Sequence, residues 1–151
     1  MKLSLLLLPF FFTSLTKAQE PIITKRIDSI ARVITQRAFS KEHQIIKGTL
    51  LLEGDKTSSI RFHLVENITE MIVVESNLRE NATLYYFKDR KLIYVVNFTN
   101  GNYNEIKNSF YLADDTACKK EGSVFTKVNP AFLLSQVSSY FDLFKEQLIA
   151  K

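Results

Sequence analysis

The sequence predicts an α+β fold in which an antiparallel meander of roughly six strands lies between an N-terminal helix and a C-terminal amphipathic helix packed on the sheet. Near the two ends of the chain, apolar residues recur every three or four positions, as in amphipathic helices. Between these ends, short segments rich in aromatic and β-branched residues alternate with turn signals. That alternation is typical of antiparallel strands joined by hairpins.

The first 18 residues have the arrangement of a secretory signal peptide. Lys2 supplies a basic start, Leu3 to Phe12 form an apolar stretch, and a polar exit ends at the small residue Ala18. The apolar stretch is shorter than the roughly 20 residues that a membrane-spanning helix needs, and no later segment supplies one. We therefore expect cleavage after Ala18 or Gln19 and a soluble, periplasmic or extracellular single domain over residues 19–151, without a transmembrane segment.

Composition limits the classes of partner and the source of stability. Lys2 and Lys17 would leave with the signal peptide, so 18 of the 20 basic residues would remain against 16 acidic ones. This mild positive charge, without a cluster of lysines and arginines, argues against nucleic acid as a partner. Cys118 is the only cysteine, so no disulfide forms within the chain and the hydrophobic core must stabilise it.

The N-terminal half of the domain is predicted to hold a helix and two strands. The apolar face of the helix consists of Ile23, Ile27, Ile30, Ile34 and Ala38. A β-rich segment over residues 44–53 follows and ends at the turn signal Gly54-Asp55. In the next strand, apolar side chains at 60, 62 and 64 alternate with Arg61 and His63. We therefore expect His63 to face solvent, on the side of the sheet opposite the core.

The strongest strand signals lie in the middle of the chain. Residues 71–74, which follow a turn at Glu66-Asn67, are continuously apolar, which predicts a strand covered on both faces. Segments 83–87 and 92–96 flank Lys88-Asp89-Arg90-Lys91 and predict a central hairpin. A turn over residues 99–102 and a sixth strand over residues 106–112 complete the predicted sheet.

The last helix has a clear start and an apolar stripe. Asn129 can cap it and Pro130 suits its first position. The stripe consists of Phe132, Leu133, Val137, Tyr140, Phe141, Phe144 and Leu148. We expect the stripe to pack on one face of the sheet, the alternative being a groove that takes a ligand or a partner.

Motifs for catalysis, metals and cofactors are absent from the sequence. It contains no glycine-rich phosphate loop, no Gly-x-Ser-x-Gly, no His-Glu-x-x-His and no Cys-x-x-Cys. His43 and His63 lie in separate segments, and Cys118 lies among charged residues in an expected loop or strand end with no partner fixed by spacing. We therefore expect no catalytic residue, no metal site and no cofactor.

Binding is the function that the residue pattern favours. On the face of the sheet expected to be open, basic and aromatic residues of different strands can point the same way, together with one residue of the Tyr85-Tyr86 pair. Such a surface suits a protein, peptide or carbohydrate partner, although the pattern fits an ordinary polar sheet face better. The candidate residues are Arg61, His63, Tyr85, Lys107 and Tyr111.

Short modification motifs also occur. Asn67, Asn81 and Asn97 each begin an Asn-x-Thr acceptor for N-glycosylation, but Asn97 lies in a predicted strand, where a glycan fits poorly. Ser29 and Thr116 each follow an aspartate, as in the acceptors of a bacterial O-glycosylation system. The host would decide which of the two patterns is used.

The central hairpin resembles one in small uncharacterised exported proteins of Gram-negative bacteria. The shared motif is a Tyr-Tyr-Phe strand, a tight turn and a Lys-Leu-Ile strand, here Tyr85 to Ile93, with Arg90 in place of the usual glycine. Phe110-Tyr111-Leu112 matches a second aromatic strand, but the usual Gly-Lys-Leu after it is absent. The resemblance implies a periplasmic or secreted location and brings no catalytic residues.

The sequence thus favours an exported, non-enzymatic protein that binds a partner or a small ligand on a sheet face or beneath a helix. The alternative is a small cell-envelope hydrolase, or an inhibitor of one. The two differ in what they require. A hydrolase needs a cleft in which His63 or Cys118 meets a second polar group, whereas a binding protein needs only a complementary surface.

Overall fold

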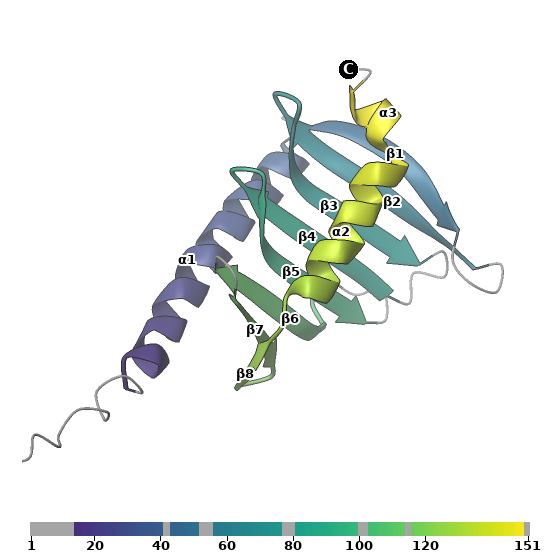
Figure 1. Ribbon diagram of the computed structural model, residues 1–151. Helices are drawn as coiled ribbons and strands as arrows, with labels where there is room; N and C mark the ends of the chain where they lie inside the picture. The colour runs from purple at the N-terminus through teal and green to yellow at the C-terminus, as the bar shows by residue number, and fades with distance from the viewer. Residues whose placement is uncertain are drawn as a thin grey trace, which may run out of the picture.

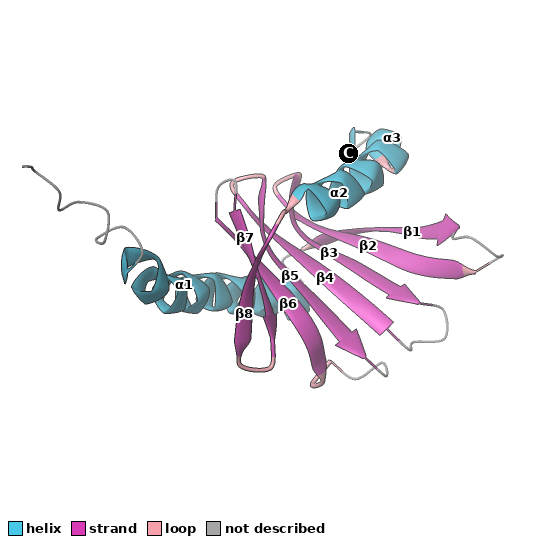
Figure 2. Cartoon of the chain, turned by 60° about the horizontal axis from the view of Figure 1, so that its bottom comes forward, coloured by secondary structure: helices cyan, strands magenta, loops and turns pink. Residues whose placement is uncertain are grey.

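The computed structural model describes residues 14–40, 43–51, 56–76, 81–99, 103–113 and 116–149. Eight antiparallel strands follow one another in sequence order in one sheet (Figure 1). They are β1 (Gln44–Leu51), β2 (Thr57–Val65), β3 (Ile68–Ser76), β4 (Asn81–Lys88), β5 (Lys91–Thr99), β6 (Ile106–Ala113), β7 (Thr116–Glu121) and β8 (Val124–Val128). Helix α1 (Ser14–Phe39) covers one face, and α2 (Ala131–Leu143), extended by the short α3 (Lys145–Ile149), covers the other (Figure 2).

The α+β class and the antiparallel meander are confirmed, but the predicted number of strands is wrong. The additional strands are β7, where the sequence around Cys118 indicated a loop or a strand end, and β8, for which the sequence indicated no element. Val124 to Lys127 of β8 are all exposed. Because this strand buries neither face well, its sequence lacks the alternation of apolar and polar residues by which a half-buried strand is recognised.

Two predicted hairpin turns are confirmed. Glu66 and Asn67 join β2 to β3, and Asp89 and Arg90 join β4 to β5, all with positive φ angles between 51° and 64°. Positive φ at both residues of a two-residue loop matches the right-handed twist of the flanking strands. Arg90 adopts this conformation where a glycine is usual. The predicted turn at Gly54-Asp55 lies outside the described residues. So do residues 100–102 of the turn predicted over 99–102, whereas Thr99 is the last residue of β5.

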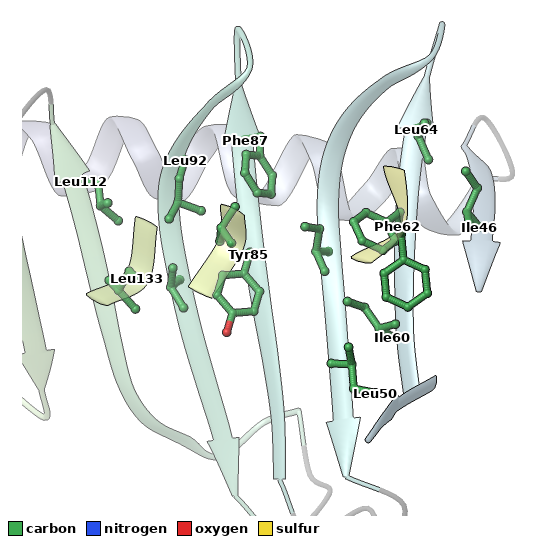
Figure 3. Close-up of a cluster of buried hydrophobic side chains, with 14 of the residues drawn as sticks. Ile46, Leu50, Ile60, Phe62, Leu64, Tyr85, Phe87, Leu92, Leu112 and Leu133 are labelled. Carbon is green, nitrogen blue, oxygen red and sulfur yellow. The ribbon is translucent and has the colours of Figure 1, made fainter. Parts of the chain in front are cut away.

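Alternate side chains of the strands form two buried layers. The layer beneath α2 contains Ile60, Phe62, Ile72, Tyr85 and Val95, which are almost completely buried (Figure 3). The layer beneath α1 contains Met71, Val73, Leu84, Tyr86, Val96 and Phe98 from the sheet. Residues 71–74 supply side chains to both layers, so the prediction of a strand covered on both faces is confirmed.

Helix α1 packs against the sheet with its apolar face. Ile27, Ala31 and Ile34 are buried there, and Ala38 is partly buried. The helix begins at Ser14, ahead of the predicted cleavage position, and its side chains are described from residue 23. Residues 1–13, with the basic start and most of the apolar stretch of the predicted signal peptide, lie outside the described residues. No helix in the described part of the chain is both long and apolar enough to span a membrane.

The predicted start of the last helix is confirmed. The Ala131 backbone N–H donates a 2.9 Å hydrogen bond to Asn129 Oδ1, and Pro130 has helical angles of φ −74° and ψ −10°. The predicted stripe is correct except at Phe132, whose side chain is 73% exposed. At about 100° per residue, Phe132 lies more than a quarter turn from the buried residues Leu133 and Val137.

Phe144, at the junction of α2 and α3, fixes these helices against β1. Its ring lies 5.3 Å from that of Phe62, measured between centroids, and is buried. A Cβ atom on Gly48 would overlap the Phe144 ring. Gly48 therefore leaves the space on β1 into which the ring fits, which explains a glycine inside a strand.

Candidate functional site

A groove of about 650 Å³ lies beside the C-terminal end of α1, on the α1 face of the sheet. We call it the α1 groove. Most of its lining is apolar and comes from α1 and from strands β1, β3, β4 and β5. These apolar residues are Ala38, Phe39, Ile45, Met71, Val73, Ala82, Leu84 and Phe98. The lining also contains the polar residues Thr35, Arg61, His63, Glu75, Asn81, Tyr86 and Tyr103, of which Arg61 and His63 are predicted from the sequence.

His63 is buried in the lining of the groove. It is 7% exposed, and neither ring nitrogen has a hydrogen-bond partner among the described residues. Burial, followed by the charges of His43 and Arg61, lowers the pKa of His63 to about 4. The imidazole is therefore neutral near pH 7 and offers one N–H donor and one acceptor nitrogen.

The prediction that His63 faces solvent is wrong, although the face was predicted correctly. Arg61 and His63 do lie opposite Ile60, Phe62 and Leu64, which belong to the layer beneath α2. The other face is not open, however, because α1 lies across it (Figure 2). Period-two alternation predicts which residues share a face, but not which element covers that face.

Arg61 has its charge balanced at the edge of the groove. Its Nη1 lies 2.7 Å from Oε2 of Glu75, and both side chains are partly buried. The hydroxyl of Tyr103 donates a hydrogen bond to the other carboxylate oxygen of Glu75. Glu75 and Tyr103, which sequence reasoning missed, thus hold Arg61 in place.

A second ion pair anchors the end of α1 and is not evident from the sequence. Arg37 Nη2 lies 2.6 Å from Glu70 Oε1, and His43 Nε2 lies 2.9 Å from Glu70 Oε2. The pairing of β2 with β3 shifts between His63 and Leu64, so that Glu70 is an extra residue in β3. Such a bulge can redirect a side chain, here toward the residues that link α1 to β1. His43, whose ring lies 5.7 Å from that of His63, has no exposed side-chain surface.

Tyrosine hydroxyls also connect the sheet to α1. Tyr86 lines the α1 groove, and its hydroxyl lies 3.0 Å from Thr35 Oγ1. The Tyr111 hydroxyl donates a 2.9 Å hydrogen bond to Asp28 of α1. Burial raises the pKa of both phenols. Tyr111 is therefore a helix–sheet contact rather than part of an open binding surface.

The remaining predicted candidates lie elsewhere. Tyr85 faces α2, where its ring packs 5.7 Å from Tyr140, and burial raises its pKa. Tyr86, and not Tyr85, is thus the residue that shares a face with Arg61. Lys107 is exposed at a shift in the pairing of β5 with β6. Of the five candidates, the structure brings only Arg61 and His63 together.

A second depression, of about 560 Å³, lies on the other side of α1, near the hairpin turns. Its lining includes Val33, Ile68, Arg37 and Glu70. The last two bind each other, although the buried Nε of Arg37 has no hydrogen-bond partner among the described residues. This depression thus contains an arginine that is already paired through its Nη2, whereas the α1 groove contains an imidazole with neither nitrogen bonded. Within the described ranges, no group of three residues is arranged to hold a metal ion.

The arrangement required for a cysteine nucleophile is not formed by Cys118 and His63. Cys118 lies on β7, His63 lies on β2, and four strands separate them in the sheet. His63 does meet a second polar group, the ring of His43, but His43 uses its Nε2 to bind Glu70. A histidine next to a histidine supplies no nucleophile of the hydroxyl or thiol type.

The modification motifs differ in accessibility. Asn67 and Asn81 are exposed, as are Ser29 and Thr116. Asn97, by contrast, accepts a 2.8 Å hydrogen bond from Thr83 and donates a 2.6 Å hydrogen bond to Asn108. A glycan on Asn97 would disrupt this network within β4, β5 and β6, as its strand position suggested.

Comparisons with models of protein families, with curated proteins and with solved structures found no match for this chain. The resemblance to exported proteins of Gram-negative bacteria therefore stays a prediction. The case for a function depends on the groove itself.

Proposed function

We propose that this protein is an exported, non-enzymatic binding protein that takes a small amphipathic ligand into the α1 groove. The observation that carries the proposal is the buried, unpartnered imidazole of His63 in the wall of a groove whose lining is mostly apolar. A buried polar group without a partner costs about 1–3 kcal/mol. A ligand that bonds to His63 would recover this free energy on binding.

The size and lining of the groove support this proposal. Small-molecule sites are mostly apolar, with a few polar groups that fix the orientation of the ligand, and they enclose about 300–1,000 Å³. The α1 groove has a volume of about 650 Å³, and its lining combines aliphatic and aromatic side chains with His63 and the paired Arg61 and Glu75. Its apolar walls would supply affinity, and the imidazole would orient the ligand.

The alternative function, a small envelope hydrolase, has less support. A general base works best when its pKa lies near the operating pH. The pKa of His63 is lowered to about 4, so its neutral ring is a weak base at neutral pH. The hydroxyls of Thr35 and Tyr86 in the groove bind each other, and neither contacts His63 in a hydrogen bond.

The proposal predicts that filling the groove abolishes binding of an apolar dye. N-phenyl-1-naphthylamine is neutral and fluoresces more strongly outside water, so we expect saturable enhancement with the wild-type protein. Ala38→Phe places a ring in the groove and should weaken binding about tenfold or more, which corresponds to at least about 1.4 kcal/mol. The matched control is Gln36→Phe, an exposed site on the same helix, which should bind like wild type. Equal binding by all three proteins, or no saturable binding by wild type, would contradict the proposal.

Export with cleavage of the signal peptide predicts that the mature protein has a defined N-terminus. The charged, apolar and small-residue order of the first 18 residues is that of a cleaved signal. Intact-mass measurement on protein recovered from the periplasm or the medium should therefore give a chain that begins at Gln19 or Glu20. A chain that retains Met1 would refute cleavage.

A further inference from the structure

The charged side chains around the α1 groove already have partners within the protein. Arg61 is paired with Glu75, and the neighbouring Arg37 is paired with Glu70. Among the described lining residues, Arg61, His63 and Glu75 are the only acids or bases apart from tyrosines. A charged ligand would lose hydration on entry and would find no counter-charge that is not already engaged.

His63 offers a different kind of contact. The residue is 7% exposed, and both of its ring nitrogens lack partners in the described part of the chain. A neutral imidazole donates one hydrogen bond and accepts another. A hydroxyl or an amide group complements it well, because each can both donate and accept. A carboxylate can only accept, and an ammonium group can only donate.

From the paired charges and the unpartnered imidazole we infer that the α1 groove selects uncharged ligands that carry a hydroxyl or amide group on an apolar body. This inference rests on the proposed function and specifies its ligand class. The apolar body would contact Met71, Val73 and Phe98, and the polar group would bind His63.

The test compares ligands that differ only in the polar group. 1-Decanol, decanoate and decylamine are used at pH 7.5 to displace N-phenyl-1-naphthylamine from the purified protein. The expected half-displacing concentration of decanol is at least about tenfold lower than that of either charged ligand, a difference of at least about 1.4 kcal/mol. If the half-displacing concentration of decanoate equals that of decanol, the inference is overturned while the proposed function stands. A dye that does not bind at all would overturn the proposed function itself.

Two variants separate the two parts of the argument. His63→Leu removes the hydrogen-bonding group but keeps an apolar side chain of similar length, so decanol should lose its advantage over the charged ligands. Glu75→Gln leaves Arg61 without its carboxylate partner, so decanoate should displace the dye at a concentration about tenfold lower than with wild type. Unchanged selectivity in Glu75→Gln would refute the role of charge pairing. That variant keeps the inference testable should His63→Leu fail to give a cooperative melting curve.

Discussion

Phe144→Ala should lower the free energy of unfolding by about 3–5 kcal/mol, the range for removal of a buried aromatic ring. Phe144 is 6% exposed and packs against Phe62, which has no exposed surface. It also holds the junction of α2 and α3 on β1. Urea unfolding would measure the loss as a lower midpoint with an unchanged slope. The control is Phe132→Ala in the same region, which should change stability by less than about 0.5 kcal/mol because the ring is 73% exposed.

Gly48 and Phe144 should also show strong coupling. Gly48→Ala alone forces a methyl group against the ring and should cost about 1–3 kcal/mol as overpacking. In the Phe144→Ala background the same methyl group enters vacated space, so its cost should fall or reverse. We expect the double-mutant cycle to depart from additivity by at least about 1 kcal/mol. Additive losses would show that the ring does not occupy the space above Gly48.

The second large effect concerns the pH dependence of stability. His63 has a pKa of about 4 in the folded protein and about 6.5 when exposed. As the pH falls below 6.5, the unfolded chain binds the proton first, so the free energy of unfolding decreases until about pH 4. The full loss attributable to His63 is about 3 kcal/mol, and it is absent above pH 6.5.

The measurement compares wild type with His63→Leu between pH 8 and pH 4.5. The ion pairs of Glu70 and Glu75 are present in both proteins, so the difference between the two curves isolates His63. The free energy of unfolding of wild type minus that of His63→Leu should be constant above pH 7 and should decrease steadily on acidification, because only wild type loses the contribution of the neutral ring. A difference that stays constant down to pH 4.5 would contradict the lowered pKa.

Local patterns predicted the elements that bury one or two faces. The alternation around Ile60 and Phe62 indicated a strand and its two faces, and the aromatic segments around Asp89-Arg90 indicated the central hairpin. Phe125 and its neighbours in β8 gave no such signal because the strand is mostly exposed. The order of the strands followed from the short turns between them.

The groove could not be predicted in the same way, because it depends on how segments far apart in the sequence lie relative to one another. Tyr85 is the wrong member of the Tyr85-Tyr86 pair, because alternation within one strand does not show which of its residues share a face with those of another strand. The register between the strands decides this. The bulge at Glu70, the pairing of Arg61 with Glu75, and the position of Ala38 above the sheet all depend on where α1 lies. The basic and aromatic pattern therefore identified Arg61 and His63 but not the helix that encloses them.

The methyl group of Met71 provides the most direct test of ligand binding in the α1 groove. Met71 lines the groove and is 4% exposed, and Met1 is the only other methionine in the sequence. Protein labelled with ¹³C at the methionine methyl groups should show a Met71 signal, assigned through Met71→Leu, that shifts on titration with N-phenyl-1-naphthylamine. The shift should saturate with the same dissociation constant as the fluorescence. A Met71 signal that stays in place while the dye binds would show that the dye binds elsewhere and would contradict a ligand site beneath α1.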